Sequence, residues 1–178
     1  MAIERIPMAV AGSISLRPWA PSDADSLVQF ANNRNIWIRL KDRFPHPYTR
    51  ADADRWIAQC MASPGPLTQF AIDLDGCAIG GVGIDPLGDV LRLTAEVGYW
   101  IGEPYWSRGF ATAALLEITR YAFAKFPLQR LQAMVFEGNT ASCRVLDKAG
   151  YTFELRIPRC IIKDGRIVDG LLYGRMRQ

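Results

Sequence analysis

The sequence predicts a mixed α/β fold of the α+β class, with a largely antiparallel central sheet and helices on both faces. Two observations predict it. The hydrophobic period changes from helical to alternating near residue 68, and the segments come in the order strand, helices, three strands, helix, strand, helix, two strands. Because 178 residues suffice for one sizeable core, we expect a single domain spanning 1–178.

The part of the chain before residue 66 is expected to contain one strand and three helical segments. Prolines and capping residues set their ends, since proline interrupts regular structure and a hydroxyl accepts a hydrogen bond from a helix N–H. In chain order they are a strand at 13–17 ended by Pro18, a helix capped by Ser22, a short helical piece at 34–40, and a helix at 50–61 capped by Thr49.

Residues 68–101 are expected to form three antiparallel strands, because alternating apolar residues are separated by turn residues. Gly80, Gly81 and Gly83 lie within a strand and do not form a nucleotide-binding glycine motif, so they predict a bulge or close packing. The remaining elements are expected to be a helix at 110–126, a strand at 131–136, a helix at 139–149, and a hairpin of strands at 151–162 and 166–175.

The stretch 91–126 runs from a strand through a loop into a long helix, and the N-terminus of this helix is a candidate anion site. The first N–H groups of a helix are unpaired and carry partial positive charge, which suits phosphate. Gly109 has no Cβ, so the backbone can approach a diphosphate, while Arg108 and Thr112 add a cation and a hydroxyl. A simple turn is the alternative interpretation of this glycine.

Composition excludes several classes of protein. Apolar runs are too short for a membrane span and the first residues lack the organisation of a signal sequence, so we expect a cytoplasmic protein without a membrane partner. No run of basic residues indicates nucleic-acid binding. The four cysteines are widely separated, which predicts no metal site. Residues 91–178 carry 13 basic and 8 acidic side chains, a balance that suits an anionic ligand.

Three motifs carry a resemblance to a known family. Residues 139–151 follow the pattern N-x-x-S-x-x-V-L-x-K-x-G-Y, downstream of W-S-R-G-F-A-T at 106–112 and G-Y-W-I at 98–101. These motifs resemble the GCN5-related N-acetyltransferase (GNAT) family, closest to the branch of ribosomal-protein N-terminal acetyltransferases. The resemblance implies the GNAT fold, in which two strands of the sheet splay apart, and acetyl-CoA (coenzyme A) as the cofactor.

The resemblance also implies where the diphosphate of coenzyme A is held. Gly109 and Ala111 match the family's loop pattern Q/R-x-x-G-x-G/A, whereas the first position is Trp106, which removes one side-chain donor. The residues expected to hold the diphosphate are Ser107, Arg108, Gly109, Phe110, Ala111 and Thr112.

In the same family the pantetheine arm lies between the splayed strands, here 91–101 and 131–136. Backbone near Tyr99 and Ile101 is expected to pair with it. Asn139 matches a family residue that contacts the cofactor, and Ser142 matches a position near the thioester sulfur.

Direct transfer from a thioester to an amine requires a group that accepts the ammonium proton. Glu96 is the first candidate for this base, because by alternation it shares a face with Gly98 and Trp100. A solvated surface carboxylate is the alternative. The family often has a tyrosine as acid on the leaving thiolate, but that position is Leu146 here, so Ser142 is the candidate acid. Protonation by solvent would also serve.

Other reactive side chains receive secondary roles. Glu103 is expected to shape the loop, Asp85 is a distant alternative base, and His46 is expected to pack a loop beside the acceptor, with substrate binding as its alternative. Cys143 is expected to be a core thiol. Four tryptophans are candidates for lining an acceptor cleft or for the core, namely Trp37, Trp56, Trp100 and Trp106.

These expectations combine into a function: an acetyl-CoA-dependent N-acetyltransferase that transfers acetyl directly to a primary amine. The branch resemblance favours a protein N-terminus as the acceptor, and small amines such as amino acids, polyamines or antibiotics are alternatives. A non-catalytic acyl-CoA sensor is the rival from another class. A third interpretation is a nucleotide-binding or hydrolytic protein, but the phosphate-loop motif usual in such proteins is absent from this sequence. If the chain self-associates, a homodimer is the default expectation.

Overall fold

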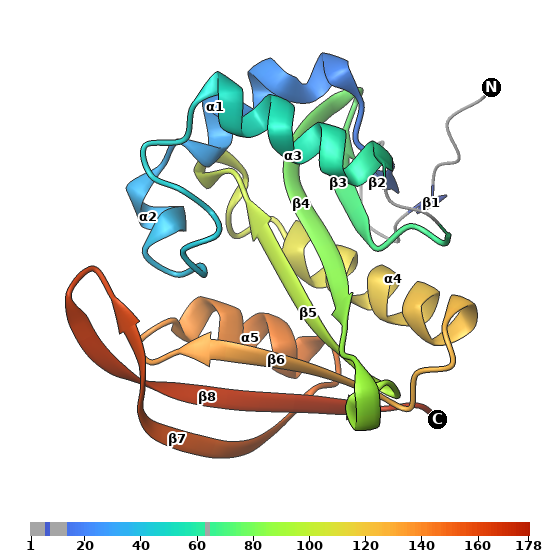
Figure 1. The fold of residues 1–178 in the computed structure, drawn as a ribbon, viewed down its shortest axis with the longest axis vertical. Coiled ribbons are helices and arrows are strands. Elements are labelled where there is room, and N and C mark those ends of the chain that lie inside the picture. Colours follow the sequence, from blue (N-terminus) through green and yellow to red (C-terminus); the bar gives the residue numbers. More distant parts are fainter. Residues whose placement is uncertain (1–5, 8–13, 63–64) are drawn as a thin grey trace.

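The computed structural model describes residues 6–7, 14–62 and 65–178. Its eight strands form one sheet in the order β1-β2-β3-β4-β5-β6-β8-β7 (Figure 1). Among the strands that the structure describes, only β5 and β6 pair in parallel. The strands are β1 (Ile6–Pro7), β2 (Ile14–Arg17), β3 (Gln69–Leu74), β4 (Cys77–Pro86), β5 (Thr94–Ile101), β6 (Arg130–Phe136), β7 (Thr152–Lys163) and β8 (Arg166–Met176).

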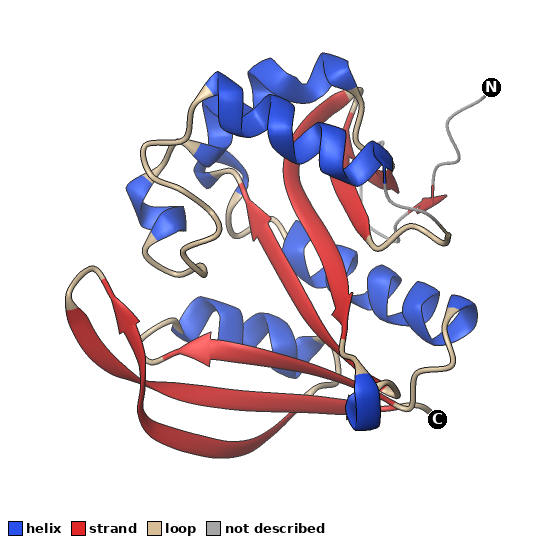
Figure 2. Cartoon of the chain, viewed as in Figure 1, coloured by secondary structure: helices blue, strands red, loops and turns tan. Residues whose placement is uncertain are grey.

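Helices cover both faces of this sheet (Figure 2). On β3, Phe70 and Ile72 join the larger core together with α4, whereas Ala71 between them joins a smaller core with α1 and α3. This is the alternation expected of a strand buried on both sides. The helices are α1 (Ala24–Ala31), α2 (Arg34–Trp37), α3 (Arg50–Ala62), α4 (Phe110–Lys125) and α5 (Thr140–Lys148). The predicted fold class, a largely antiparallel sheet flanked by helices, is confirmed.

The sheet divides between β5 and β6. Residues 94–96 of β5 pair with 130–132 of β6, and beyond them β5 continues along β4 while β6 continues along β8. The two strands therefore separate after Glu96, as Figure 1 shows. We call this separation the fork. It confirms the splayed strands that the GNAT resemblance implied.

Several predicted boundaries need correction near the N-terminus and before β5. Ser22 does not cap the first long helix, because Pro21–Asp23 form a 3-10 turn and Asp23 is the residue before α1. The Asp23 carboxylate instead accepts the Ala20 N–H at 2.9 Å. The helical piece predicted at 34–40 ends at Trp37. Residues 89–91 form a 3-10 turn, so β5 starts later than predicted.

The glycines of β4 lie where strands pack tightly, as predicted. A Cβ on Gly80 would collide with the Trp100 carbonyl oxygen, and one on Gly81 would come within 2.8 Å of the Trp100 indole nitrogen. The pairing of β3 with β4 also shifts register beside Gly80. Glycine at these positions thus lets β4 lie against β5, with the Trp100 side chain packed over Gly81.

A buried ion network fixes the first strand to its neighbours. Arg17 is 4% exposed. Its guanidinium donates to both carboxylate oxygens of Asp23 at 2.7 Å and to Asp73 at 2.8 Å. The hydrogen bond to Asp23 is the main cause that raises the pKa of Arg17 above its usual value. Through this one cation β2 is bound to β3 and to the turn that starts α1.

We predict that Arg17→Ala lowers the free energy of unfolding by about 3–5 kcal/mol, because it removes the guanidinium that neutralises two buried carboxylates. Urea denaturation measures this change. The control is Arg120→Ala, since Arg120 is 70% exposed and pairs with Glu117 on the surface of α4, where such pairs contribute at most about 1 kcal/mol. Equal losses in the two variants would contradict the structural role of Arg17.

Candidate active site

The fork brings two of the predicted site residues into contact. Tyr99 on β5 reaches α5, where its hydroxyl oxygen lies 2.8 Å from Ser142 Oγ and 3.3 Å from the Ser142 carbonyl oxygen. Burial raises the pKa of Tyr99 well above its usual value, so its hydroxyl stays protonated near neutral pH. The pair places two neutral hydroxyl groups beside the fork.

Asn139 positions Ser142 from the start of α5. The Asn139 side-chain oxygen accepts the Ser142 N–H at 3.3 Å, which makes Asn139 the N-cap of this helix. A capping asparagine fixes the direction in which the first turn begins. Asn139 therefore has a structural contact, in addition to the cofactor role that the resemblance implied for it.

The N-terminus of α4 is open in front of its first turn. Gly109 is the N-cap and has φ +81°, and Ser107 also has a positive φ of 62°. A Cβ added to Gly109 would meet no atom within 4 Å. The first N–H that bonds within the helix is that of Ala113, which donates to the Gly109 carbonyl at 3.0 Å. The helix thus offers the N–H groups of 110–112 to a ligand.

Trp106 fastens the loop that precedes α4. Its indole N–H donates to the carbonyl oxygen of Ile101 at 2.7 Å, and the guanidinium of Arg39 lies 5.5 Å from the centre of its ring. Arg108 lies over the ring of Tyr105 at 5.6 Å. The residue that departs from the family pattern therefore anchors the loop to the end of β5.

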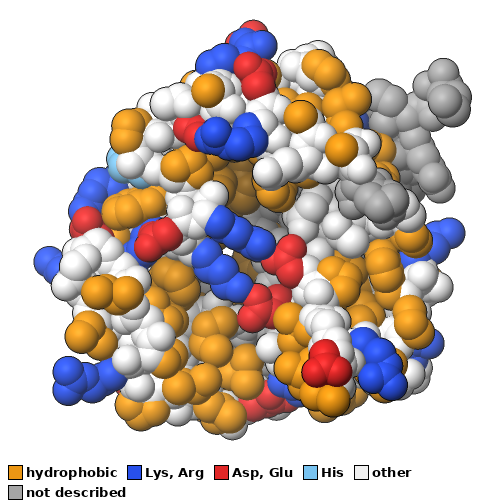
Figure 3. All heavy atoms as spheres, viewed as in Figure 1, with side chains coloured by type: hydrophobic (Ala, Val, Ile, Leu, Met, Phe, Trp, Pro, Cys, Tyr) orange, Lys and Arg blue, Asp and Glu red, His pale blue; other side chains and the backbone are white. Residues whose placement is uncertain are grey.

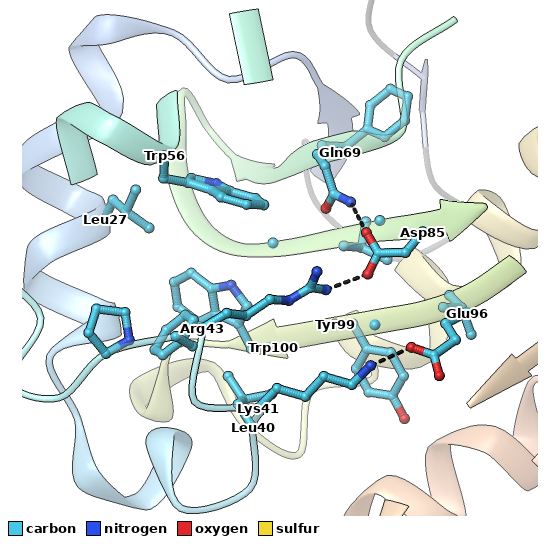
Figure 4. A pocket seen from close by; sticks show the side chains of 18 of the residues that line it. Leu27, Leu40, Lys41, Arg43, Trp56, Gln69, Asp85, Glu96, Tyr99 and Trp100 are labelled. Atoms are coloured by element: carbon cyan, nitrogen blue, oxygen red, sulfur yellow. Dashed lines mark hydrogen bonds and ion pairs between the residues drawn. The ribbon is translucent and has the colours of Figure 1, made fainter. Parts of the chain in front are cut away.

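A cavity of about 370 Å³ lies between β5, β4 and the segment 39–56, and it reaches Met134 and Phe136 of β6. Figure 4 shows Trp56 and Trp100 on its apolar side and charged residues along the strands. Trp37 and Trp106 are not among its lining residues. Of the four tryptophans proposed for an acceptor cleft, two therefore line this cavity.

Two carboxylates face each other across the strands that border the cavity. Asp85 on β4 and Glu96 on β5 are directly opposite in the antiparallel register, an arrangement that is unfavourable for like charges. Each has a cation from the segment 38–49: Lys41 pairs with Glu96 and Arg43 pairs with Asp85. Gln69 also donates to Asp85 at 3.1 Å. Figure 3 shows basic and acidic side chains gathered beside a hollow near the centre of this face.

Sequence reasoning did not find Lys41 or Arg43. Lys41 is 55 positions from Glu96 and Arg43 is 42 positions from Asp85, and no spacing pattern connects them. The one available signal was the presence of two cations in a loop before two prolines, which is too common to indicate a site.

The remaining candidates lie outside the cavity. Glu103 accepts hydrogen bonds from Asn33 at 2.6 Å and from Asn35 at 3.2 Å. These bonds, led by the one from Asn33, lower the pKa of Glu103 and tie the loop before α4 to α2. His46 stacks on Trp37 with ring centres 5.5 Å apart. Their positions agree with the shaping and packing roles expected of Glu103 and His46.

Among residues 6–7, 14–62 and 65–178, no three His, Cys, Asp or Glu side chains are arranged to hold a metal ion. Within the same described ranges, no helix is both long and apolar enough to cross a membrane.

Comparison with known sequences finds related proteins along most of the chain. Residues 13–152 match the family described as "Acetyltransferase (GNAT) domain". In Bacillus subtilis (strain 168), the protein named "Putative ribosomal N-acetyltransferase YdaF" is 32% identical over 164 residues, which cover 89% of this chain and 85% of YdaF. The uncharacterized N-acetyltransferase YokL of the same strain is 24% identical over 168 residues, which cover 93% and 91%.

Solved structures show the same fold. Mycobacterium smegmatis RimJ in complex with CoA-disulfide has a TM-score of 0.79 at 25% identity, over 98% of this chain and 86% of RimJ. RimL, a ribosomal L7/L12 alpha-N-protein acetyltransferase in complex with coenzyme A, has a TM-score of 0.83 at 19% identity, over 97% and 98%.

We predict that Trp106→Phe loosens the loop before α4, because it keeps a ring but removes the indole N–H that binds the Ile101 carbonyl. Loss of one such bond costs about 1 kcal/mol. Hydrogen exchange of the amides at 102–109 measures the change and should become faster there. Trp56→Phe is the control, since Trp56 lies on α3 and should leave exchange at 102–109 as it is. Unchanged exchange in Trp106→Phe would show that the indole bond does not hold this loop.

Proposed function

Because this chain belongs to the GNAT acetyltransferase family, to which residues 13–152 match, we propose that it transfers an acetyl group from acetyl-CoA directly to a primary amine. The observation that carries the proposal is the fork of β5 and β6 beside the open N-terminus of α4. A narrow slot bordered by strand backbone suits a pantetheine arm, and a helix N-terminus suits the diphosphate attached to it.

The donor site follows from the backbone directions. Gly102 donates its N–H to the Ile79 carbonyl of β4 at 2.8 Å, so by alternation the backbone groups of Ile101 and Tyr99 point toward the fork. The Ile101 carbonyl already accepts a hydrogen bond from the indole N–H of Trp106. We therefore assign the Ile101 N–H, together with the backbone N–H and carbonyl of Tyr99, to hydrogen bonds with pantetheine.

The diphosphate is assigned to the backbone of the α4 N-terminus. Asn139, the N-cap of α5, is proposed to contact the cofactor near its pantetheine segment. The residues proposed to hold the diphosphate are Ser107, Arg108, Gly109, Phe110, Ala111 and Thr112. The basic excess of 91–178 supports this assignment. Acetyl-CoA supplies the activated acyl group, a thioester with a good leaving thiolate.

The proton transfers are assigned to Glu96 and Ser142. Glu96 borders the cavity, so we propose it as the base that takes the ammonium proton of an acceptor entering from that side. The hydroxyl groups of Tyr99 and Ser142 are hydrogen-bonded to each other, and Tyr99 also lines the cavity. Because the Tyr99 hydroxyl stays protonated, it can donate a hydrogen bond to the Ser142 hydroxyl. Ser142 is the proposed acid that protonates the leaving thiolate.

The acceptor is proposed to be the N-terminal amine of a protein. The likeness to RimJ over nearly the whole chain and to YdaF supports this choice. The cavity favours a second candidate, a small primary amine, because its volume of about 370 Å³ is within the range of small-molecule sites. Parallel assays with short peptides and with amines such as spermidine separate the two acceptors.

We predict that calorimetric titration detects saturable binding of acetyl-CoA, and that Gly109→Trp weakens it on the order of tenfold or more by filling the space before α4. Gly109→Ala is the matched control, because it shares the backbone strain of a side chain at φ +81° but adds only a Cβ. Equal loss in both variants would assign the effect to strain. No binding of acetyl-CoA or CoA by the parent would overturn the donor site.

We predict that Glu96→Gln lowers kcat by about 10²–10⁴, as expected for loss of a general base, while acetyl-CoA affinity is retained. Thiol release with peptides and amines measures the rate. Glu117→Gln on α4 is the control for exchanging a carboxylate for an amide away from the fork. A parent protein that binds acetyl-CoA but acetylates no amine would refute catalysis and support an acyl-CoA sensor.

A further inference from the structure

We propose that Lys41 is itself an acetyl acceptor, modified in the active site of its own chain. The proposal rests on the proposed acetyl-CoA-dependent function. It adds a modification site in the segment between α2 and α3, and it assigns the substrate chemistry of that site: the primary amine of a lysine side chain.

The position of the Lys41 amine carries the inference. Its Nζ forms an ion pair with Glu96, the proposed general base (Figure 4). Glu96 is also the last residue of β5 that pairs with β6, so this ammonium lies at the point where the fork opens. A primary amine that must lose a proton is thus already bound to the group that would take it, beside the proposed path of the thioester.

The side chain has the freedom that the reaction requires. Lys41 is 52% exposed and belongs to a loop, whereas the adjacent Arg43 holds that loop to β4 through Asp85. A flexible lysine stem on an anchored loop can move its amine by a short distance without displacing the loop.

The other lysines of the chain provide the contrast. The sequence contains four lysines and 17 arginines. Lys163 is 4% exposed at its side chain, binds Asp42 at 2.7 Å and lies over the ring of Trp37, so it is not accessible. Lys125 and Lys148 are exposed at the ends of α4 and α5, outside the cavity lining. Only Lys41 is both accessible and bound to a carboxylate of the cavity.

The transfer to Lys41 needs no reactant other than acetyl-CoA. Glu96 takes one proton from the Lys41 ammonium, and the freed nitrogen attacks the thioester carbonyl carbon. A C–N bond forms, the C–S bond breaks, and the second nitrogen proton passes to the leaving thiolate through Ser142. The products are acetyl-lysine, CoA with a free thiol, and one proton that Glu96 returns to water.

The modification would change acceptor binding. Acetyl-lysine carries no charge, so the ion pair with Glu96 is lost and the carboxylate becomes available to an incoming ammonium. In the unmodified protein Lys41 competes with the acceptor for the same carboxylate. Acetylation therefore converts a self-blocked site into an open one.

The test is incubation of the full chain with acetyl-CoA and no added amine, followed by peptide mapping of each lysine over time. We expect Lys41 to be acetylated about a hundredfold faster than Lys125 or Lys148, given the contribution of a positioned base. The half-time should not depend on protein concentration, because transfer occurs within one chain. Glu96→Gln should lower the acetylation rate of Lys41 and leave the acetylation rates of Lys125 and Lys148 unchanged.

Lys125 and Lys148 serve as internal controls for spontaneous acetylation, and Lys41→Arg removes the acceptor while keeping the positive charge. The proposal is overturned if Lys41 reacts no faster than these two lysines, if Glu96→Gln does not slow it, or if its rate rises in proportion to protein concentration. Acetylation of an added amine without Lys41 modification would overturn this inference alone. Absence of both reactions would overturn the proposed function as well.

Discussion

The short parallel pairing of β5 and β6 is the contact on which the whole site depends. Parallel strands need a crossover connection, and α4 supplies it. A helix that follows a strand in this way has its N-terminus at the carboxyl end of that strand. The fork and the open helix terminus are therefore two results of one strand-helix-strand unit. The sheet beyond β6 adds β8 and β7, which hold β6 on the far side of the fork.

Much of this arrangement could be predicted because it is encoded locally. The helix starting at Phe110, the hairpin of β7 and β8, and the antiparallel run from β3 to β5 each have their own periodicity and turn residues. The motifs that resemble the GNAT family also lie in contiguous stretches, 98–112 and 139–151. The two-residue strand β1 was not predicted. The other errors lie at element ends, as at Ser22, where the buried pairing of Asp23 with Arg17 shifted the start of the helix.

The charged side of the site could not be predicted, since tertiary contacts decide it. Whether Glu96 is solvated or paired depends on where the segment 38–49 lies, and no local pattern fixes that position. The contact of Tyr99 with Ser142 was likewise hidden, although each residue had been singled out separately. Tyr99 and Ser142 come into contact only in the folded chain, where β5 and β6 have diverged.

The contact between Lys163 and Asp42 joins residues 121 positions apart. It connects the tip of the last hairpin to the segment that borders the cavity, and Trp37 lies against the same ammonium. During synthesis on the ribosome, the amino-terminal half emerges long before this lysine does. The segment that borders the cavity can therefore make this contact only after residue 163 has left the exit tunnel, so the border of the cavity is not complete before then.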